Sequence, residues 1–479
     1  MMSTNRKTII WIRNDLRLQD NPALATAAEA GEILPVYIWD IDSHGAWAPG
    51  AASRVWLHHG LHTFRKALAK ANVPFVVRDG DSVQELRKLI AETGADRVVW
   101  NRRYEPALRA TDERVKKALA EDGVEVQDFP GNLLFEPWTV ETRAGDPYKV
   151  FTPFWRTCLN GEEPLPPFTA PATMQAFADV PESLTVDDLD LLPHGEDDWD
   201  RSLIRHWEVG ERAAWDRFQE FLDDAVAEYD EDRDLPGIDG TSLMSPYLQF
   251  GEISVRRMWS AVRALSPKSD YHQKSIDRYL AELGWREFAH HLLYHFPETT
   301  DQPLRKEFED FPWSNDLVEL EHWQQGKTGY PIVDAGMRQL WREGWMHNRV
   351  RMIVASFLTK DLLIPWQMGA RWFWDTLVDA NLANNTLGWQ WTAGCGADAA
   401  PYFRIFNPVT QGQRYDPDGS YVREYVPELK ELEGVEVHEP WLRIVPELYV
   451  NGNGQYPDPM VEHSLARNRA LMAYDRIKK

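Results

Sequence analysis

The chain has 479 residues, of which 43% are hydrophobic and 27% charged. This length and balance predict two or three folded units and exclude a fibrous or largely disordered chain. The net charge of −23 excludes broad, unselective binding to nucleic acid, because phosphate contacts require lysine and arginine, so any DNA site must be a local basic patch.

The beginning of the chain carries no targeting signal. Its first apolar run, at 8–12, is too short for a signal peptide or a membrane span, and we expect a cytoplasmic protein without membrane contact. The two cysteines, Cys158 and Cys395, lie far apart and outside any CxxC or Cys/His cluster. We therefore expect small buried residues there, with no disulfide framework and no metal site.

Short apolar runs alternate with amphipathic segments over 1–134, which predicts a doubly wound parallel α/β domain. The strand-like runs are 8–12, 33–39, 74–78, 97–100 and 124–129. After the first run the chain continues as RNDLRL at 13–18, without the GxGxxG of dinucleotide-binding folds. An ordinary nicotinamide-dependent dehydrogenase is thus excluded.

Residues 135–205 are rich in proline and acidic side chains, and we expect an interdomain linker that crosses the surface. From 206 to 479 apolar residues recur at three-to-four spacing, which predicts an all-α domain. The expected helices cover 210–229, 254–264, 273–295, 332–344, 349–363 and 370–382.

One helix face offers a set of possible metal ligands. Glu287, His291 and His295 follow one another at four-residue spacing. The segment lacks an HExxH pattern, and we interpret these residues as satisfied side chains of a packed helix.

Six segments of the helical half carry a specific pattern. They are GTSLMSPYL at 240–248, ELGWREF at 282–288, GKTGYPIVDAGM at 326–337, GWMHNRVRM at 344–352, DANLANNTLGWQW at 379–391 and DAAPYFRIFNPVTQ at 398–411. In this order and spacing they resemble the photolyase/cryptochrome family, most of all a class I cyclobutane pyrimidine dimer photolyase, and the resemblance extends over the whole chain. It implies an N-terminal antenna domain and a C-terminal domain that binds FAD and repairs DNA, in a monomeric protein.

The hydroxyls of Thr241, Ser242 and Ser245 are short donors near a helix start, where anions are favoured. The resemblance implies a U-shaped FAD inside the helical domain. The implied FAD-binding residues are Tyr229, Thr241, Ser242, Leu243, Met244, Ser245, Arg286, Trp345, Asn348, Arg351, Asp379, Asn381 and Asn385.

Within this set the resemblance pairs Arg351 with Asp379 beside the flavin N5, where a cation would stabilise an anionic reduced flavin. It places Asn385 at the same edge, where plant cryptochromes usually have Asp. The chain departs from the family at Asn381, which is commonly Asp. An amide oxygen there can still accept from the flavin N3–H.

Glu282 and Trp285 lie three residues apart on one helix face, which offers a carboxyl and a stacking surface to a flipped pyrimidine dimer. The resemblance adds Trp391 as a second wall and Asn348 and Met352 as dimer contacts. The (6-4) photolyase branch typically has histidines in that helix instead. Contacts to DNA are implied for Arg233, Glu282, Trp285, Arg349 and Arg404.

The chain has 22 tryptophans, an enrichment that indicates stacking or electron transfer beyond packing. Trp389, Trp366 and Trp313 match the family's electron relay, although each could be a core residue. The antenna chromophore implied for the first domain is methenyltetrahydrofolate or 8-hydroxydeazaflavin. His44, Arg54 and Glu105 are candidate contacts that do not decide between them.

Two other functions stay open beside repair of cyclobutane dimers. One is repair of (6-4) photoproducts. The other is a cryptochrome-type light sensor, which we expect less because the sequence stops at Lys479 without the long tail of many signalling members. A flavin-free helical interaction protein is a further alternative, which a colourless preparation would indicate.

Overall fold

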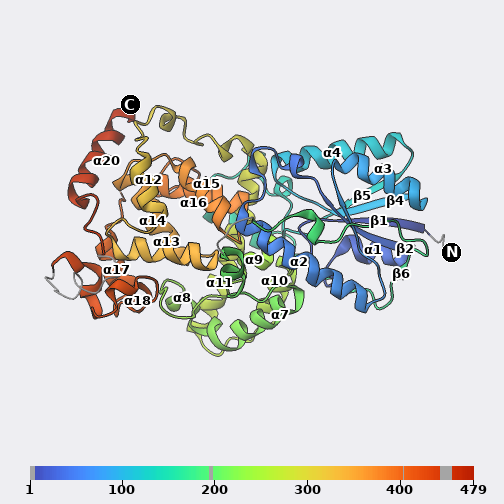
Figure 1. Cartoon of the computed structure of the whole chain (residues 1–479), viewed down its shortest axis with the longest axis horizontal. Helices are drawn as coiled ribbons and strands as arrows, with labels where there is room; N and C mark the ends of the chain where they lie inside the picture. Colours follow the sequence, from blue (N-terminus) through green and yellow to red (C-terminus); the bar gives the residue numbers. More distant parts are fainter. Residues whose placement is uncertain (1–5, 194–197, 403, 443–455, 479) are drawn as a thin grey trace.

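The computed structural model describes residues 6–193, 198–402, 404–442 and 456–478. It shows an α/β domain at the N-terminal end and a larger helical domain beside it (Figure 1). The two domains adjoin along helix α2, Ala51–Lys70.

The N-terminal domain is built on a parallel sheet of order β3-β2-β1-β4-β5. Its strands are β1 Arg6–Ile12, β2 Gly31–Trp39, β3 Val76–Asp79, β4 Arg97–Asn101 and β5 Glu125–Phe129. All five strands predicted from the apolar runs are confirmed. The central strands are apolar over most of their length because helices cover both faces of the sheet.

Alternate residues of β1 point to different cores. Ile10 and Ile12 lie in one core with α1 and α2, whereas Ile9 and Trp11 lie in the other with α3 and α4. The helices on the first side are α1 Pro22–Ala30 and α2, and those on the second are α3 Ser82–Thr93 and α4 Pro106–Glu121. This arrangement is the predicted doubly wound fold.

The segment 135–205 is more ordered than a surface crossing requires. It contains α5 Phe151–Asn160, whose Phe154 and Trp155 are buried, and the two-residue strand β6 Gln175–Ala176, which pairs with β2. A short 3₁₀ turn, η3 Asp187–Leu189, and α6 Trp199–Ile204 follow. The aromatic residues of α5 explain the burial, because they pack into the core that the two domains share.

The rest of the chain is helical, as predicted. Its main helices are α7 Glu211–Glu220, α8 Tyr229–Asp232, α9 Ser245–Gln249, α10 Val255–Arg263, α11 Asp270–His295, α12 Leu317–Gln324, α13 Pro331–Glu343, α14 Asn348–Ser356, α15 Trp366–Thr376, α16 Leu382–Ala393, α17 Pro408–Tyr415, α18 Ser420–Tyr425 and α20 His463–Ile477.

The expected helix at 370–382 is shifted toward the N-terminus. Pro365 precedes the first residue of α15, a position that its fixed φ suits, and the chain leaves the helix at Leu377 in an extended conformation. The chain then turns at 378–379, and the side chain of Asn381 accepts from the Asn384 N–H and caps α16. Apolar periodicity alone did not locate this break.

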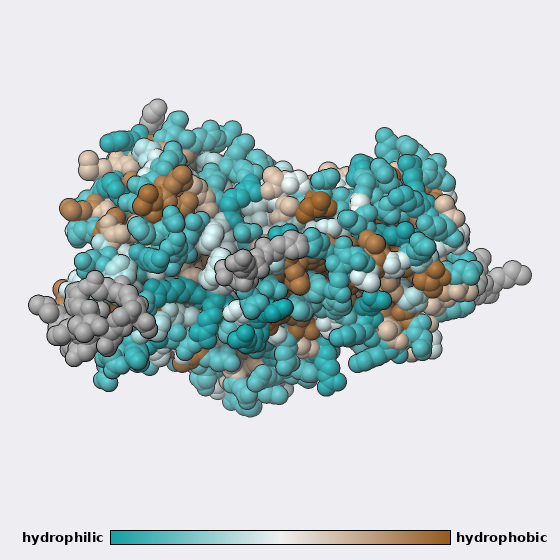
Figure 2. Space-filling view, in the orientation of Figure 1, coloured by the Kyte–Doolittle hydropathy of each residue, from teal (hydrophilic) through white to brown (hydrophobic). Residues whose placement is uncertain are grey.

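The face of the molecule shown in Figure 2 is mostly hydrophilic, with separate apolar patches. Within the described ranges, every helix is too short or too polar to span a bilayer. Cys158 and Cys395 are both buried free thiols, as predicted.

Candidate functional site

Helix α14 forms the centre of the candidate site. The preceding helix, α13, ends at Gly344, whose φ of 65° is left-handed and turns the chain sharply. His347 then caps α14, since its Nδ1 accepts from the Arg349 backbone N–H at 3.2 Å. Asn348, Arg351 and Met352 therefore share one side of the helix.

Arg351 makes the pair with Asp379 that the sequence predicted. Its Nη1 and Nη2 donate to the two carboxylate oxygens at 3.1 and 2.7 Å, and its Nε donates to the Met346 carbonyl at 2.7 Å. The carboxylate is almost completely buried, with a side-chain exposure of 2%. Such a bidentate contact fixes the guanidinium plane in one orientation.

Residues 241–245 form a tight turn before α9. Leu243 has φ of 53°, an uncommon value for a non-glycine residue. Ser242 Oγ accepts from the Tyr279 hydroxyl at 3.0 Å, and Ser245 Oγ accepts from Trp345 Nε1 at 3.3 Å. Because each serine oxygen acts as an acceptor, each hydroxyl hydrogen stays available for donation to an anion.

The remaining predicted flavin contacts come from two sides of this region. Asn381 donates to Gln249 Oε1 at 2.9 Å, and Asn385 donates to the Ala370 carbonyl at 3.0 Å. Tyr229 and Met244 are buried, and Tyr229 packs edge-on against Tyr279. Gln249, which orients Asn381, was missed because nothing in its local sequence marks it.

A second cluster of charges lies beside α14. Arg233 donates to Glu282 and lies 3.8 Å from Asp234, and Arg349 donates to Asp234 at 2.6 Å. Burial opposes the charge of Arg233, but Glu282 together with Tyr229 and Asp234 outweighs this effect, so the pKa of the guanidinium lies above its ordinary value. Asp234, which links the two arginines, was missed by sequence reasoning, because its contact with Arg349 joins distant parts of the chain.

His347 faces this cluster from the start of α14. Burial, with Arg349, Arg233 and Arg351 nearby, lowers its pKa to about 4, which the charge of Asp234 only partly offsets. The imidazole is therefore neutral at physiological pH and keeps its acceptor for the helix cap. His347 lies within the GWMHNRVRM segment at 344–352, but sequence reasoning assigned it no role.

Trp285 has one ring face occupied. It stacks on Phe151 with ring centroids 3.8 Å apart and an interplanar angle of 10°. Glu282 lies one helical turn before Trp285 on α11, so its carboxyl and the partly buried indole lie on the same side of this helix. Trp391 is also partly buried, and Arg404 is exposed.

Arg286 lies in a different environment from the other predicted flavin contacts. Its Nη1 donates to the Asn132 carbonyl at 2.8 Å and lies 3.3 Å from Glu287. This position is at the junction with the N-terminal domain. Its proposed contact with FAD stays a prediction.

The possible metal ligands on α11 are used by the backbone of the linker. Glu287 accepts from Leu134 N and Phe135 N at 2.8 and 3.1 Å. His291 accepts from Tyr148 N at its Nε2, and its Nδ1 pairs with the Pro137 carbonyl, which also contacts His295. The interpretation as satisfied helix-face side chains is confirmed.

The predicted relay tryptophans differ in exposure. Trp389 and Trp366 are buried in the core of the C-terminal helices, whereas Trp313 is partly buried at the edge of that core. Trp389 packs edge-on against Trp323 and Phe373, with ring centroids 6.2 and 5.0 Å apart. These contacts are compatible with packing alone, so the relay stays a prediction.

Comparison with known proteins identifies the family. A family model for the FAD binding domain of DNA photolyase matches residues 279–476, and one for DNA photolyase matches residues 8–172. A deoxyribodipyrimidine photo-lyase of Agrobacterium fabrum is 47% identical over 475 residues, covering 98% of each chain. The chain belongs to the photolyase/cryptochrome family.

Solved photolyase and cryptochrome structures share the whole fold. A bacterial class III photolyase from Agrobacterium tumefaciens has a TM-score of 0.94 and 46% identity, covering 99% of this chain and 98% of that one. A Synechocystis cryptochrome has a TM-score of 0.87 and 30% identity, covering 98% and 99%. The resemblance to class I enzymes had not anticipated a class III relative.

The side chains of this photolyase-family domain suit FAD. Ser242 and Ser245 offer hydroxyl hydrogens to a diphosphate, while Arg351 and Asn385 offer N–H groups to a flavin edge. The donors come from α9, α14 and α16, so they can surround a folded cofactor. The chemistry of this donor set fits an anionic, planar dinucleotide.

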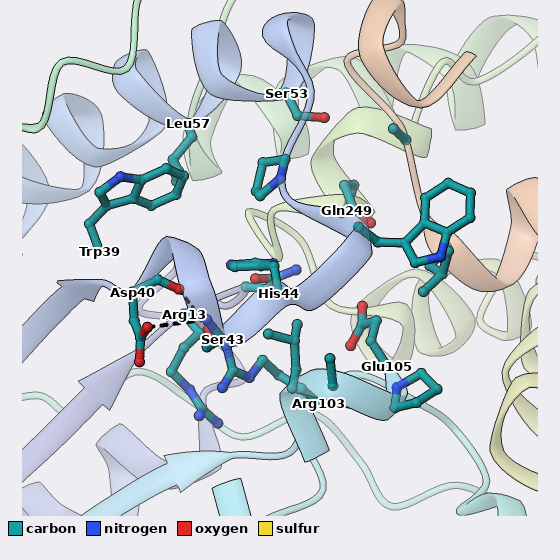
Figure 3. A pocket seen from close by; sticks show the side chains of 18 of the residues that line it. Arg13, Trp39, Asp40, Ser43, His44, Ser53, Leu57, Arg103, Glu105 and Gln249 are labelled. Carbon is teal, nitrogen blue, oxygen red and sulfur yellow. Dashed lines mark hydrogen bonds between the residues drawn. The ribbon is translucent and has the colours of Figure 1, made fainter. Parts of the chain in front are cut away.

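A pocket with a cavity volume of about 170 Å³ lies at the carboxyl ends of β1, β2 and β4 (Figure 3). This is where the strand order reverses, the usual ligand position in such sheets. His44, Glu105 and Arg103 line it together with Trp39. Burial, with Arg103 nearby, lowers the pKa of His44 to about 4. Among the three candidate antenna contacts, Arg54 is absent from this lining.

Proposed function

We propose that this protein is a DNA photolyase that uses light and reduced FAD to repair cyclobutane pyrimidine dimers. One observation carries the proposal: α14 joins the two groups of predicted residues. Arg351 reaches Asp379 in the group implied for flavin, and Arg349 reaches Asp234 in the group implied for DNA. A single short helix thus borders both sites.

Bound FAD would supply the excited-state electron that opens the cyclobutane ring. The chain contributes a fixed charge and fixed donors. Arg351, oriented by Asp379, would hold a cation against the flavin, and Asn385 would present an amide that cannot ionise. A preorganised cation of this kind stabilises an anion without reorganisation.

Glu282 and Trp285 would receive the extruded dimer. The Arg233 guanidinium fixes the Glu282 carboxyl, and stacking on Phe151 fixes the plane of Trp285. In the N-terminal half of α14, Asn348 is exposed and Met352 is partly exposed. These neutral side chains support a cyclobutane dimer, since the (6-4) branch has histidines in this helix.

Three further assignments accompany this function. The chain divides into an antenna domain at 1–134, a linker at 135–205 and a repair domain at 206–479. The pocket at the strand ends would take the antenna chromophore, a folate or a deazaflavin. The protein would act as a monomer, most like the class III branch.

The test uses the FAD-loaded, photoreduced protein and two oligonucleotides, one with a cyclobutane thymine dimer and one with a (6-4) photoproduct. Blue light should restore thymine in the first and leave the second unchanged, and a dark sample serves as control. Glu282→Ala should lower repair per absorbed photon at least about tenfold, the loss typical for one removed electrostatic contact, while FAD stays bound. An unchanged quantum yield would remove Glu282 from the site.

A light sensor is the second candidate, because the chain is also similar to cryptochromes. Arabidopsis thaliana Cryptochrome-2 is 37% identical over 490 residues, which cover 80% of its length. Reduction of the flavin by light without any restored thymine would favour the sensor. A colourless preparation would instead indicate a flavin-free scaffold.

A further inference from the structure

Three side chains with metal-binding atoms meet on the surface of α2. His58 and His62 are four residues apart and so share a face of this helix. Asp187, the first residue of η3, approaches both. Its Oδ1 lies 3.1 Å from His62 Nε2 and 3.7 Å from His58 Nε2, and the three atoms all lie within 4.8 Å of one another.

His58 lacks good hydrogen-bond partners in this position. The residue is buried, and its Nδ1 contacts no acceptor or donor in the part of the chain that the structure describes. Its Nε2 is too far from Asp187 for a normal hydrogen bond. A buried imidazole with neither nitrogen in a normal hydrogen bond to the protein is uncommon, and an ion bound at Nε2 would give the ring a polar partner.

The surroundings favour a cation. Asp200, in α6, is close enough to interact electrostatically with His58 and His59. Two carboxylates, Asp187 and Asp200, therefore face this group of imidazoles. The charge of −23 on the whole chain acts in the same direction.

The donor set is selective for certain metals. Two imidazole nitrogens and one carboxylate oxygen suit zinc, nickel, copper or ferrous iron, whereas magnesium and calcium prefer oxygen alone. Metal–ligand bonds of about 2.0–2.1 Å in a tetrahedral site place neighbouring donor atoms roughly 3.4 Å apart. The separations of 3.1 and 3.7 Å from Asp187 Oδ1 to the two imidazoles lie on either side of that value, and the third, between the imidazole nitrogens, is within 4.8 Å.

We infer that His58, His62 and Asp187 bind a divalent transition metal ion, with zinc as the reference, and that this ion fastens the linker to α2. Water would complete the coordination. Helix α2 also contacts the helical domain, because Ser53 Oγ donates to the Leu377 carbonyl and Ala51 N donates to Asp375 at 2.9 Å. The ion would thus strengthen the linker at the helix that joins both domains, independently of the proposed repair activity.

Binding is measured by calorimetry on the untagged, FAD-loaded, chelator-treated protein, titrated with zinc chloride and separately with magnesium chloride. We expect a single zinc site, a higher thermal midpoint with zinc, and no magnesium site. Any ligand that binds only the folded state produces such a shift. His62→Gln and Asp187→Asn should each weaken zinc binding at least about tenfold, since losing a residue that merely orients a ligand already has that effect.

Two variants serve as matched controls. His59→Gln changes a neighbouring histidine outside the cluster, and His295→Gln breaks the other histidine pair with four-residue spacing. Both should bind zinc like the unmodified protein. All four variants should melt at the unmodified protein's temperature without metal, because the changed side chains are exposed or partly exposed.

The inference is overturned by any of three results. Zinc binding could survive both His62→Gln and Asp187→Asn, or His295→Gln could weaken it as strongly as they do. Magnesium could also compete with zinc on equal terms, which would indicate diffuse binding to carboxylates.

Discussion

The ion pair between Arg351 and Asp379 can be tested with Arg351→Met. Methionine keeps much of the length and apolar surface of arginine but cannot donate. The change removes two donors from the Asp379 carboxylate, at 3.1 and 2.7 Å, and one from the Met346 carbonyl at 2.7 Å. The carboxylate then stays in an almost completely buried position without its partner.

The cost follows from the burial of the two partners. Removing one member of a fully buried pair costs about 3–5 kcal/mol. Arg351 has a side-chain exposure of 24%, so water can screen part of the loss, and we expect about 2–3 kcal/mol. For a protein of this size each kcal/mol lowers the thermal midpoint by about 1 °C, which predicts a decrease of about 2–3 °C.

The measurement is thermal unfolding of the FAD-loaded protein. Arg212→Met is the matched control, because Arg212 pairs with Asp216 at 3.1 Å on the exposed surface of α7, with side-chain exposures of 91% and 56%. Breaking that pair should cost no more than about 0.5 kcal/mol. Arg351→Met should also lose FAD on dialysis, unlike the control. If both variants melt within 1 °C of each other and both retain FAD, the Arg351–Asp379 pair neither stabilises the fold nor helps to hold FAD.

Three other residues give separate tests. Burial raises the pKa of Glu252 to about 8. Between about pH 4.5 and 8 the folded state therefore holds a proton that the unfolded state has released. The free energy of unfolding should fall as pH rises through this range, by at most about 1.4 kcal/mol per pH unit. Glu252→Gln should reduce this slope in melting curves from pH 5 to 8.5, and an unchanged slope would assign it to other groups. His347→Ala should cost about 1 kcal/mol through the lost helix cap, and His347→Asn, which can cap, should recover most of it in the same assay. Arg404→Met should weaken binding to damaged and undamaged duplexes alike and reduce the slope of log affinity against log salt by about 1, whereas an unchanged slope would place Arg404 away from the phosphates.

The sequence predicted the fold well because its signals are local. Each strand of the sheet is a short apolar run, and the helices that cover both faces repeat at helical spacing. The misplaced helix at 370–382 shows the limit of that reasoning. Its true start depends on Pro365, and its true end depends on the turn between Leu377 and Asn381. Apolar periodicity continues through both and conceals them.

The site was less predictable, since its pairs join distant parts of the chain. The Arg351–Asp379 pair was anticipated from the family pattern, and the structure contains it. The links through Asp234 and Gln249 were not, because a carboxylate or an amide in a loop has no sequence signal until its partner is placed. His58 and His62 show the same limit, as their third companion, Asp187, lies more than a hundred residues away.

The charge cluster beside α14 also explains how so acidic a protein could bind DNA. Arg233 and Arg349 are held in place by Glu282 and Asp234, so they are ordered before any phosphate arrives. A phosphate that binds Arg349 must displace the Asp234 carboxylate, which would still lie 3.8 Å from Arg233. Each phosphate contact therefore replaces one anion by another, and it contributes less binding free energy than a contact with an unpaired arginine would. Affinity would then depend on the fit of the extruded dimer against Glu282 and Trp285 more than on backbone charge, which makes damaged DNA the favoured ligand over the undamaged duplex.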